Sequence, residues 1–82
     1  MTWKFEVAAT KQRRLFSRIL QALESQMVTI DAFAAETKDD AVHICFVISS
    51  EEDRAYRIEA LLHRLEDVRS VSVSRRSEVL SG

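Results

Sequence analysis

The chain has 82 residues, which is enough for one small domain and no more. It carries 12 Lys and Arg against 13 Asp and Glu, and this net charge of −1 gives no overall attraction to nucleic acid or to anionic lipid. The single cysteine excludes a disulfide framework, and no segment approaches the roughly 20 apolar residues of a membrane span. The N-terminus lacks the basic region and apolar core of a signal peptide, so we expect a cytoplasmic protein.

The first segment, residues 2–9, predicts a strand with one buried face because its side chains alternate in polarity. One side carries Trp3, Phe5 and Val7, and the other carries Lys4 and Glu6.

Residues 11–26 and 50–66 predict two helices, since apolar residues recur at spacings of three and four. The first stripe consists of Phe16, Ile19, Leu20, Leu23 and Met27, with Leu15 and Ala22 on its flank. The second consists of Ala55, Ile58, Leu61, Leu62 and Leu65. Thr10 is the expected N-cap of the first helix, and Ser49 with Glu52 predicts a capping box for the second.

Three further strands are predicted at 28–37, 41–48 and 69–75, the first two joined by a polar hairpin at 38–40. Segment 41–48 has the apolar composition of a central strand, whereas 28–37 is expected at an edge. Within it, Ile30 and Phe33 are three residues apart and cannot both point inward from a regular strand. Either a bulge intervenes or Phe33 faces a partner.

The order β-α-β-β-α-β predicts an α+β, ferredoxin-like sandwich: a four-stranded antiparallel sheet with two helices on one face. We expect a single domain at 1–75, followed by a flexible tail at 76–82. The predicted core consists of Phe5, Val7, Phe16, Leu20, Leu23, Ile44, Phe46, Ile58, Leu62, Leu65 and Val71.

Residues with catalytic potential are few. His43 and Cys45 share one face of a strand, but no orienting acid or Cys-x-x-Cys pattern accompanies them, so we interpret them as a small buried thiol beside a half-exposed histidine. RNA binding on this fold needs aromatic rings on the open face, and here alternation turns Trp3, Phe5 and Phe46 toward the helices. We therefore expect no catalytic residues, no metal, no cofactor and no nucleic acid.

The start of the first helix carries an unusual density of cations: Lys11, Arg13, Arg14 and Arg18. The helix dipole disfavours positive charge at this end. These residues either hold an anion or an acidic partner surface, or form an ordinary solvated basic face.

Three stretches carry a resemblance to a known family: Leu15-Phe16-Ser17-Arg18-Ile19-Leu20, Val28-Thr29-Ile30-Asp31-Ala32-Phe33 and Leu65-Glu66-Asp67-Val68-Arg69-Ser70-Val71. From Phe5 to Arg75 the chain resembles an ACT domain, a small regulatory module that commonly binds amino acids. Within that family it looks most like the short small subunit of acetolactate synthase.

The resemblance implies a ligand site at the opening of the first helix, where amino-acid-binding ACT domains have Asn/Asp-x-Pro-Gly-x-Leu. Alignment on Leu15 places Thr10, Gln12 and Arg13 at the polar, proline and glycine positions. The long Arg13 side chain would fill this pocket or meet a carboxylate directly. The full expected ligand set is Thr10, Gln12, Arg13, Arg14 and Ile30.

The same resemblance implies a non-catalytic regulatory subunit that binds and activates the large catalytic subunit of acetolactate synthase in branched-chain amino-acid biosynthesis. A stand-alone amino-acid sensor or interaction module is the alternative, with a branched-chain amino acid as the ligand. We expect a homodimer through edge strand 28–37, which is long and has no protecting proline. The expected interface residues are Phe33, Lys11 and Arg18.

Overall fold

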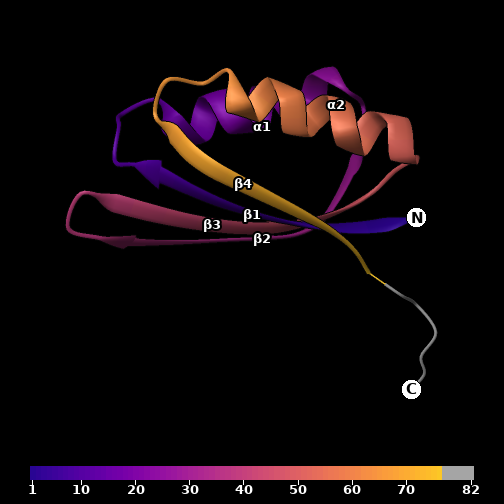
Figure 1. Cartoon of the computed structure of the whole chain (residues 1–82), viewed down its shortest axis with the longest axis horizontal. Coiled ribbons are helices and arrows are strands. Elements are labelled where there is room, and N and C mark those ends of the chain that lie inside the picture. The colour runs from indigo at the N-terminus through magenta and orange to yellow at the C-terminus, as the bar shows by residue number, and fades with distance from the viewer. Residues whose placement is uncertain (77–82) are drawn as a thin grey trace.

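The computed structural model describes residues 1–76, which form a four-stranded sheet covered on one face by two helices (Figure 1). The elements, in chain order, are β1 (Thr2–Thr10), α1 (Leu15–Ser25), β2 (Thr29–Lys38), β3 (Ala41–Ser49), α2 (Glu52–His63) and β4 (Val68–Arg76). The sheet order is β2-β3-β1-β4, and every neighbouring pair is antiparallel. The predicted α+β ferredoxin-like sandwich is confirmed, with β2 at one edge as expected.

The chain ends differ slightly from the prediction. Arg76, assigned to the tail, is the last residue of β4, and the remainder of the predicted tail, 77–82, lies outside the described residues. Within residues 1–76, neither helix is long and apolar enough to cross a membrane.

The core lies between the helices and the two central strands. Phe5 of β1 and Phe46 of β3 are fully buried and stack with ring centroids 4.7 Å apart and an interplanar angle of 10°. The side chains at less than 4% exposure, to which both strands and both helices contribute, are Trp3, Phe5, Val7, Ala9, Leu15, Ile19, Leu23, Val42, Ile44, Phe46, Ile48, Ala55, Ile58 and Leu62. The prediction that Trp3, Phe5 and Phe46 face the helices is confirmed.

Helix α1 buries only one side of the predicted stripe, together with Leu15 on its flank. Leu15, Ile19 and Leu23 are buried, whereas Phe16 and Leu20, predicted as core, remain 38% and 37% exposed. The apolar residues of α1 cover a wider arc than the sheet of one copy can accept, so the two on one flank stay at the surface. Leu65 and Val71, also predicted as core, are half-buried and pack against its margin.

Both predicted helix caps are wrong. The N-cap of α1 is Arg14 and that of α2 is Glu51, and neither makes a side-chain capping bond. Thr10 instead belongs to β1, and the backbone N–H of Lys11 donates to the Asp40 carbonyl at 2.7 Å. Because the backbone of Lys11 is still hydrogen-bonded to the sheet, residues 12–14 are needed to connect it to the helix layer, and α1 begins at Leu15.

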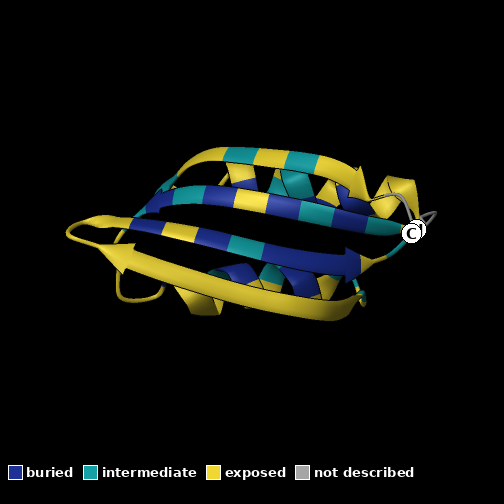
Figure 2. Cartoon of the chain, turned by 90° about the horizontal axis from the view of Figure 1, so that it is seen from below, coloured by how far each residue is buried: buried dark blue, intermediate teal, exposed yellow. Residues whose placement is uncertain are grey.

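A bulge in β2 resolves the conflict between Ile30 and Phe33. Ile30 pairs with Ile48 and Phe33 with Phe46, with the register shift between Ile30 and Ala32, so both side chains face the helix side. Both are nevertheless 37% exposed, and every residue of β2 is exposed (Figure 2). The strand lies at the edge of the sheet, where its helix-facing side chains are only partly covered.

Two non-glycine residues have left-handed backbone conformations, Met27 with φ 56° after α1 and Asp39 with φ 55° in the β2–β3 hairpin. Met27 is also 85% exposed. Its N–H donates to the Glu24 carbonyl, and the guanidinium of Arg54 donates to the carbonyl of Gln26, which links the end of α1 to α2.

Candidate functional site

The connection between β1 and α1 is held by hydrogen bonds at each end. The Thr10 hydroxyl accepts a bond from Arg69 Nε at 2.8 Å, and the Thr10 N–H donates to the Asp67 carbonyl at 2.8 Å. At the helix start, the Gln12 side-chain oxygen accepts a bond from the Arg14 N–H at 2.8 Å. Gln12 therefore takes over part of the capping role that we had assigned to Thr10.

The positive charge at the start of α1 is not balanced within the described residues. Lys11, Arg13 and Arg14 are exposed and Arg18 is half-buried, while the first turn of α1 contains no acidic residue. None of the ion pairs found in residues 1–76 involves these four cations. This basic opening (Lys11, Arg13, Arg14 and Arg18) is suited to an anion or an acidic surface.

An apolar edge lies along the β2 side of the molecule, formed by Phe16 and Leu20 of α1 with Ile30 and Phe33 of β2. All four side chains are 37–38% exposed. Helix α2 lies against β4 and beside α1, so α1 occupies the β2 side of the helix layer. The right-handed turn of α1 then carries Phe16 and Leu20 toward the β2 edge, whereas Ala22 and Arg18, on the other flank, are half-buried.

The predicted ligand residues do not all meet in one copy of the chain. Thr10, Gln12, Arg13 and Arg14 lie together where β1 ends. Ile30 pairs with Ile48, which pairs with Trp3 near the other end of β1. At about 3.4 Å per residue, the seven residues from Trp3 to Thr10 separate Ile30 from the basic opening by roughly 24 Å.

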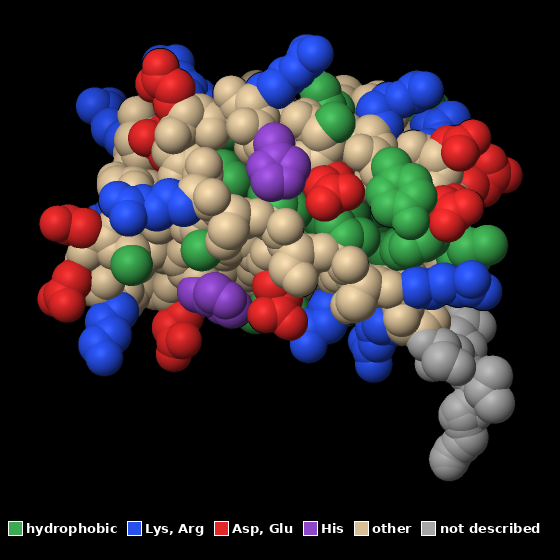
Figure 3. Space-filling view, viewed as in Figure 1, with side chains coloured by type: hydrophobic (Ala, Val, Ile, Leu, Met, Phe, Trp, Pro, Cys, Tyr) green, Lys and Arg blue, Asp and Glu red, His purple; other side chains and the backbone are tan. Residues whose placement is uncertain are grey.

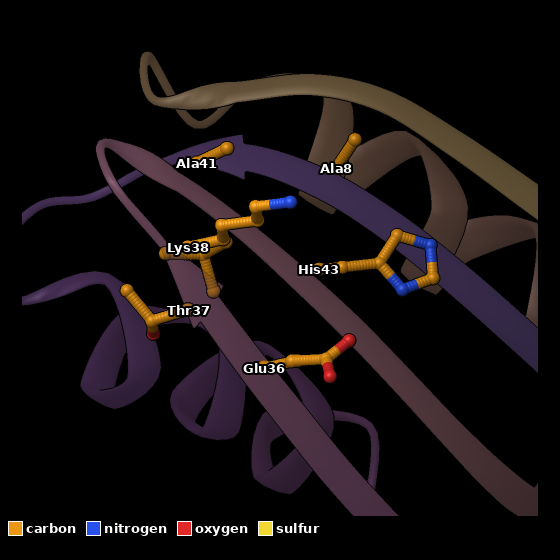
Figure 4. Close-up of a pocket in the computed structure, with 7 residues that line it drawn as sticks. Ala8, Glu36, Thr37, Lys38, Ala41 and His43 are labelled. Carbon is orange, nitrogen blue, oxygen red and sulfur yellow. The ribbon is translucent and has the colours of Figure 1, made fainter.

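The open face of the sheet carries small and charged side chains. The Glu6 carboxylate lies 3.4 Å from Lys4 Nζ and 3.9 Å from His43 Nε2, and all three side chains are about half exposed. A shallow hollow beside them is lined by Ala8, Glu36, Thr37, Lys38, Ala41, Val42 and His43, from β1, β2 and β3 (Figure 4). Cys45, expected to be buried, is half-buried on this face. Residues 1–76 contain no cluster of three or more His, Cys, Asp or Glu arranged for a metal.

The sequence prediction missed the contribution of α1 to the exposed edge. It named Phe33 as an interface residue but placed Phe16 and Leu20 in the core. The available signal was the width of the stripe: Leu15, Phe16, Ile19, Leu20 and Leu23 span more of the helix than one buried face needs.

No protein-family profile matches this sequence, and no curated protein matches it. Solved structures do. The ACT domain from GTP pyrophosphokinase of Chlorobium tepidum superposes with a TM-score of 0.81 at 12% identity, covering 90% of this chain and 97% of that one. The regulatory subunit of aspartate kinase from Thermus thermophilus gives 0.69 at 10% identity, covering 89% of this chain and 50% of that one.

A homoserine dehydrogenase from Thiobacillus denitrificans gives a TM-score of 0.76 at 18% identity, where the match covers 88% of this chain but only 16% of the enzyme. At such identities the likeness is one of fold. The similarity extends over nearly all of the described strands and helices, and it agrees with the strand order β2-β3-β1-β4. The chain therefore has the fold of an ACT domain.

Proposed function

We propose that this protein is a non-catalytic regulatory subunit that works in the cytoplasm by binding a larger enzyme. The large catalytic subunit of acetolactate synthase is the proposed partner, and the pathway is branched-chain amino-acid biosynthesis. The observation that carries the proposal is the apolar edge on an ACT fold, since four partly exposed large side chains on one edge suit a protein contact. The three stretches that resemble the small subunit of acetolactate synthase supply the choice of partner.

A homodimer through β2 forms part of this proposal. Two copies related by a two-fold axis can pair their β2 strands in antiparallel fashion and continue the sheet across the junction. Registers centred on Phe33 or on Ala34 place no two like charges opposite each other, because the charged residues of β2, Asp31, Glu36 and Lys38, fall opposite uncharged ones. The contact would cover Ile30 and Phe33 directly and bring Phe16 and Leu20 beside their copies.

Amino-acid sensing is the second candidate, and one geometric relation favours it. In the register centred on Ala34, and with the bulge at Asp31, the partner subunit's Ile30 would come opposite Thr37. Thr37 pairs with Val42, which in turn pairs with Ala9 near the end of β1. The dimer would therefore bring Ile30 of one copy level with the basic opening of the other, about 14 Å away across three strand spacings, whereas one copy holds them roughly 24 Å apart along the strands. A branched-chain amino acid is the proposed ligand.

The test is reconstitution with the acetolactate synthase large subunit from the same organism. Addition of this chain should raise the rate of acetolactate formation and should saturate at a fixed ratio of the two subunits. A variant carrying Phe16→Glu and Leu20→Glu should activate less, whereas Ala60→Glu on the exposed face of α2 should behave like the unchanged chain.

The outcomes separate the two candidates. Saturating activation with no heat of binding for valine, leucine or isoleucine supports a pure activator. Micromolar binding of one of these amino acids without activation supports the sensor. If the rate is unchanged and none of the three amino acids binds, both functions are wrong.

A further inference from the structure

The second edge of the sheet, strand β4, differs chemically from the β2 edge. Among the described residues, β4 pairs with β1 alone, so the other side of its backbone has no strand beside it. Its nine residues contain three arginines, Arg69, Arg75 and Arg76, all exposed, and no acidic residue. Figure 3, which views this edge, shows a band of backbone and small side chains with Lys or Arg side chains near both ends.

The side chains of β4 leave its backbone accessible. Ser70, Ser72 and Ser74 pair with Ala8, Glu6 and Lys4 and therefore lie on the open face of the sheet. Val71 and Val73 lie on the helix side, where they are half-buried against the core. An added strand would thus meet small hydroxyls on one face and apolar surface on the other, with no proline in β4 to prevent pairing.

Charge disfavours a second copy of this chain as the added strand. In an antiparallel pairing of β4 with itself, the register with the greatest overlap is centred on Ser72. That register sets Arg69 of one copy opposite Arg75 of the other, twice over. Like charges directly opposite each other destabilise a strand pair. Registers of β4 centred on Val71 or Val73 avoid this contact, but they shorten the pairing from nine residues to seven. The β2 edge has no such conflict in its two longest registers, so charge favours self-pairing at β2 over self-pairing at β4.

We propose that the β4 edge binds an extended acidic segment of another protein, which adds to the sheet as a fifth strand. Carboxylates on that segment would meet Arg75 and Arg76, and its backbone would bond to the free side of β4. If the segment belongs to the catalytic enzyme, this inference rests on the proposed function. The existence of a strand-addition site on β4 does not depend on that function.

The test uses the full chain and a synthetic probe, a blocked ten-residue peptide that alternates valine and glutamate. A matched peptide carries lysine in place of glutamate. Amide hydrogen exchange and backbone NMR shifts, followed during titration to millimolar peptide, locate the contact. We expect the glutamate peptide to slow exchange of alternate β4 amides and to leave β2 amides unchanged.

Charge reversal identifies the residues responsible. Arg75→Glu with Arg76→Glu should weaken binding of the glutamate peptide by roughly tenfold and should improve binding of the lysine peptide. A control with the same change in net charge, Arg57→Glu on α2 with Arg64→Glu at its C-cap, should leave both affinities within about twofold of the original. Unchanged circular dichroism would establish that the variants fold.

Three results would overturn the inference: equal binding of both peptides, protection at β2 instead of β4, or no binding of the glutamate peptide at millimolar concentration. In the last case, increased self-association of the Arg75→Glu, Arg76→Glu variant in sedimentation would mean that the arginines only prevent β4 from pairing with itself. The peptide experiment needs no enzyme, so its failure and a failure of the acetolactate synthase assay remain distinct.

Discussion

Phe33 stacks on Phe46 with ring centroids 6.1 Å apart and an interplanar angle of 13°, so the core stacking continues to the rim of the sheet. Phe46 stacks in turn on Phe5, which makes a row of three rings across β1, β3 and β2. The first two rings are fully buried and the third is 37% exposed. The row ends at an edge where a second copy could extend it.

This row predicts a difference between two alanine substitutions. Phe46→Ala should lower the free energy of unfolding by about 3–5 kcal/mol, enough to unfold much of a domain this small. Phe33→Ala should cost clearly less in the monomer, because its ring already faces solvent on one side. Urea unfolding of dilute protein measures both, and equal losses would contradict the order of burial.

The apolar edge predicts a change in self-association. Phe16→Glu with Leu20→Glu should convert the proposed dimer to a monomer in sedimentation velocity at tens of micromolar. Both side chains are more than a third exposed, so circular dichroism should keep its native shape. Ala60→Glu, on the exposed face of α2, should leave the dimer intact. If the wild-type chain is monomeric throughout this concentration range, the proposal of a homodimer is wrong.

Met27 predicts a stabilising substitution. Its φ of 56° lies in the left-handed region, which costs a non-glycine residue about 1–2 kcal/mol. Met27→Gly should therefore raise the free energy of unfolding by up to about 1 kcal/mol, the remainder being lost to the flexibility of glycine in the unfolded chain. Gln26→Gly, at the preceding position with φ −96°, should not stabilise the domain. Chemical unfolding at a fixed low concentration compares the two.

The basic opening predicts opposite effects on stability and on function. Arg13→Glu with Arg14→Glu places the preferred charge at the start of α1, so the isolated domain should gain a few tenths of a kcal/mol. Activation of the catalytic subunit should fall through slower association, and the rate should depend less on salt than in the wild type. Stopped-flow association at two salt concentrations tests this. An association rate equal to that of the wild type would mean that these arginines are ordinary solvated charges with no role in binding.

The strand positions could be predicted from the sequence because the alternation of apolar and polar side chains fixes which residues can form a strand with one buried face. The strand beginning at Thr2 ends one residue later than predicted, and β4 extends the predicted strand by one residue at each end. The strand order follows from the usual order of the predicted fold, in which the first and third strands are central, and the apolar composition of 41–48 agrees with a central strand. The strand positions, by contrast, depend on each residue and its neighbours in the sequence.

The errors concern features set by tertiary geometry. Sequence could pose the conflict between Ile30 and Phe33 but could not choose the bulge at Asp31, because a bulge is a relation between two strands. Likewise, the spacing of Phe16 and Leu20 fits a buried stripe, and only the position of α1 above the sheet decides which flank is covered. The basic opening was found because its four charges lie within eight residues of the chain, 11–18.

The strand order has a consequence for stoichiometry. If two copies join through β2, their β4 strands become the outer strands of one eight-stranded sheet, about 34 Å apart at a spacing of about 4.8 Å per strand. The two outer strands are then equivalent and run in opposite directions. Such an assembly presents two identical binding positions related by a two-fold axis, and it is best matched by a partner that is itself two-fold symmetric, in a complex of equal numbers of chains.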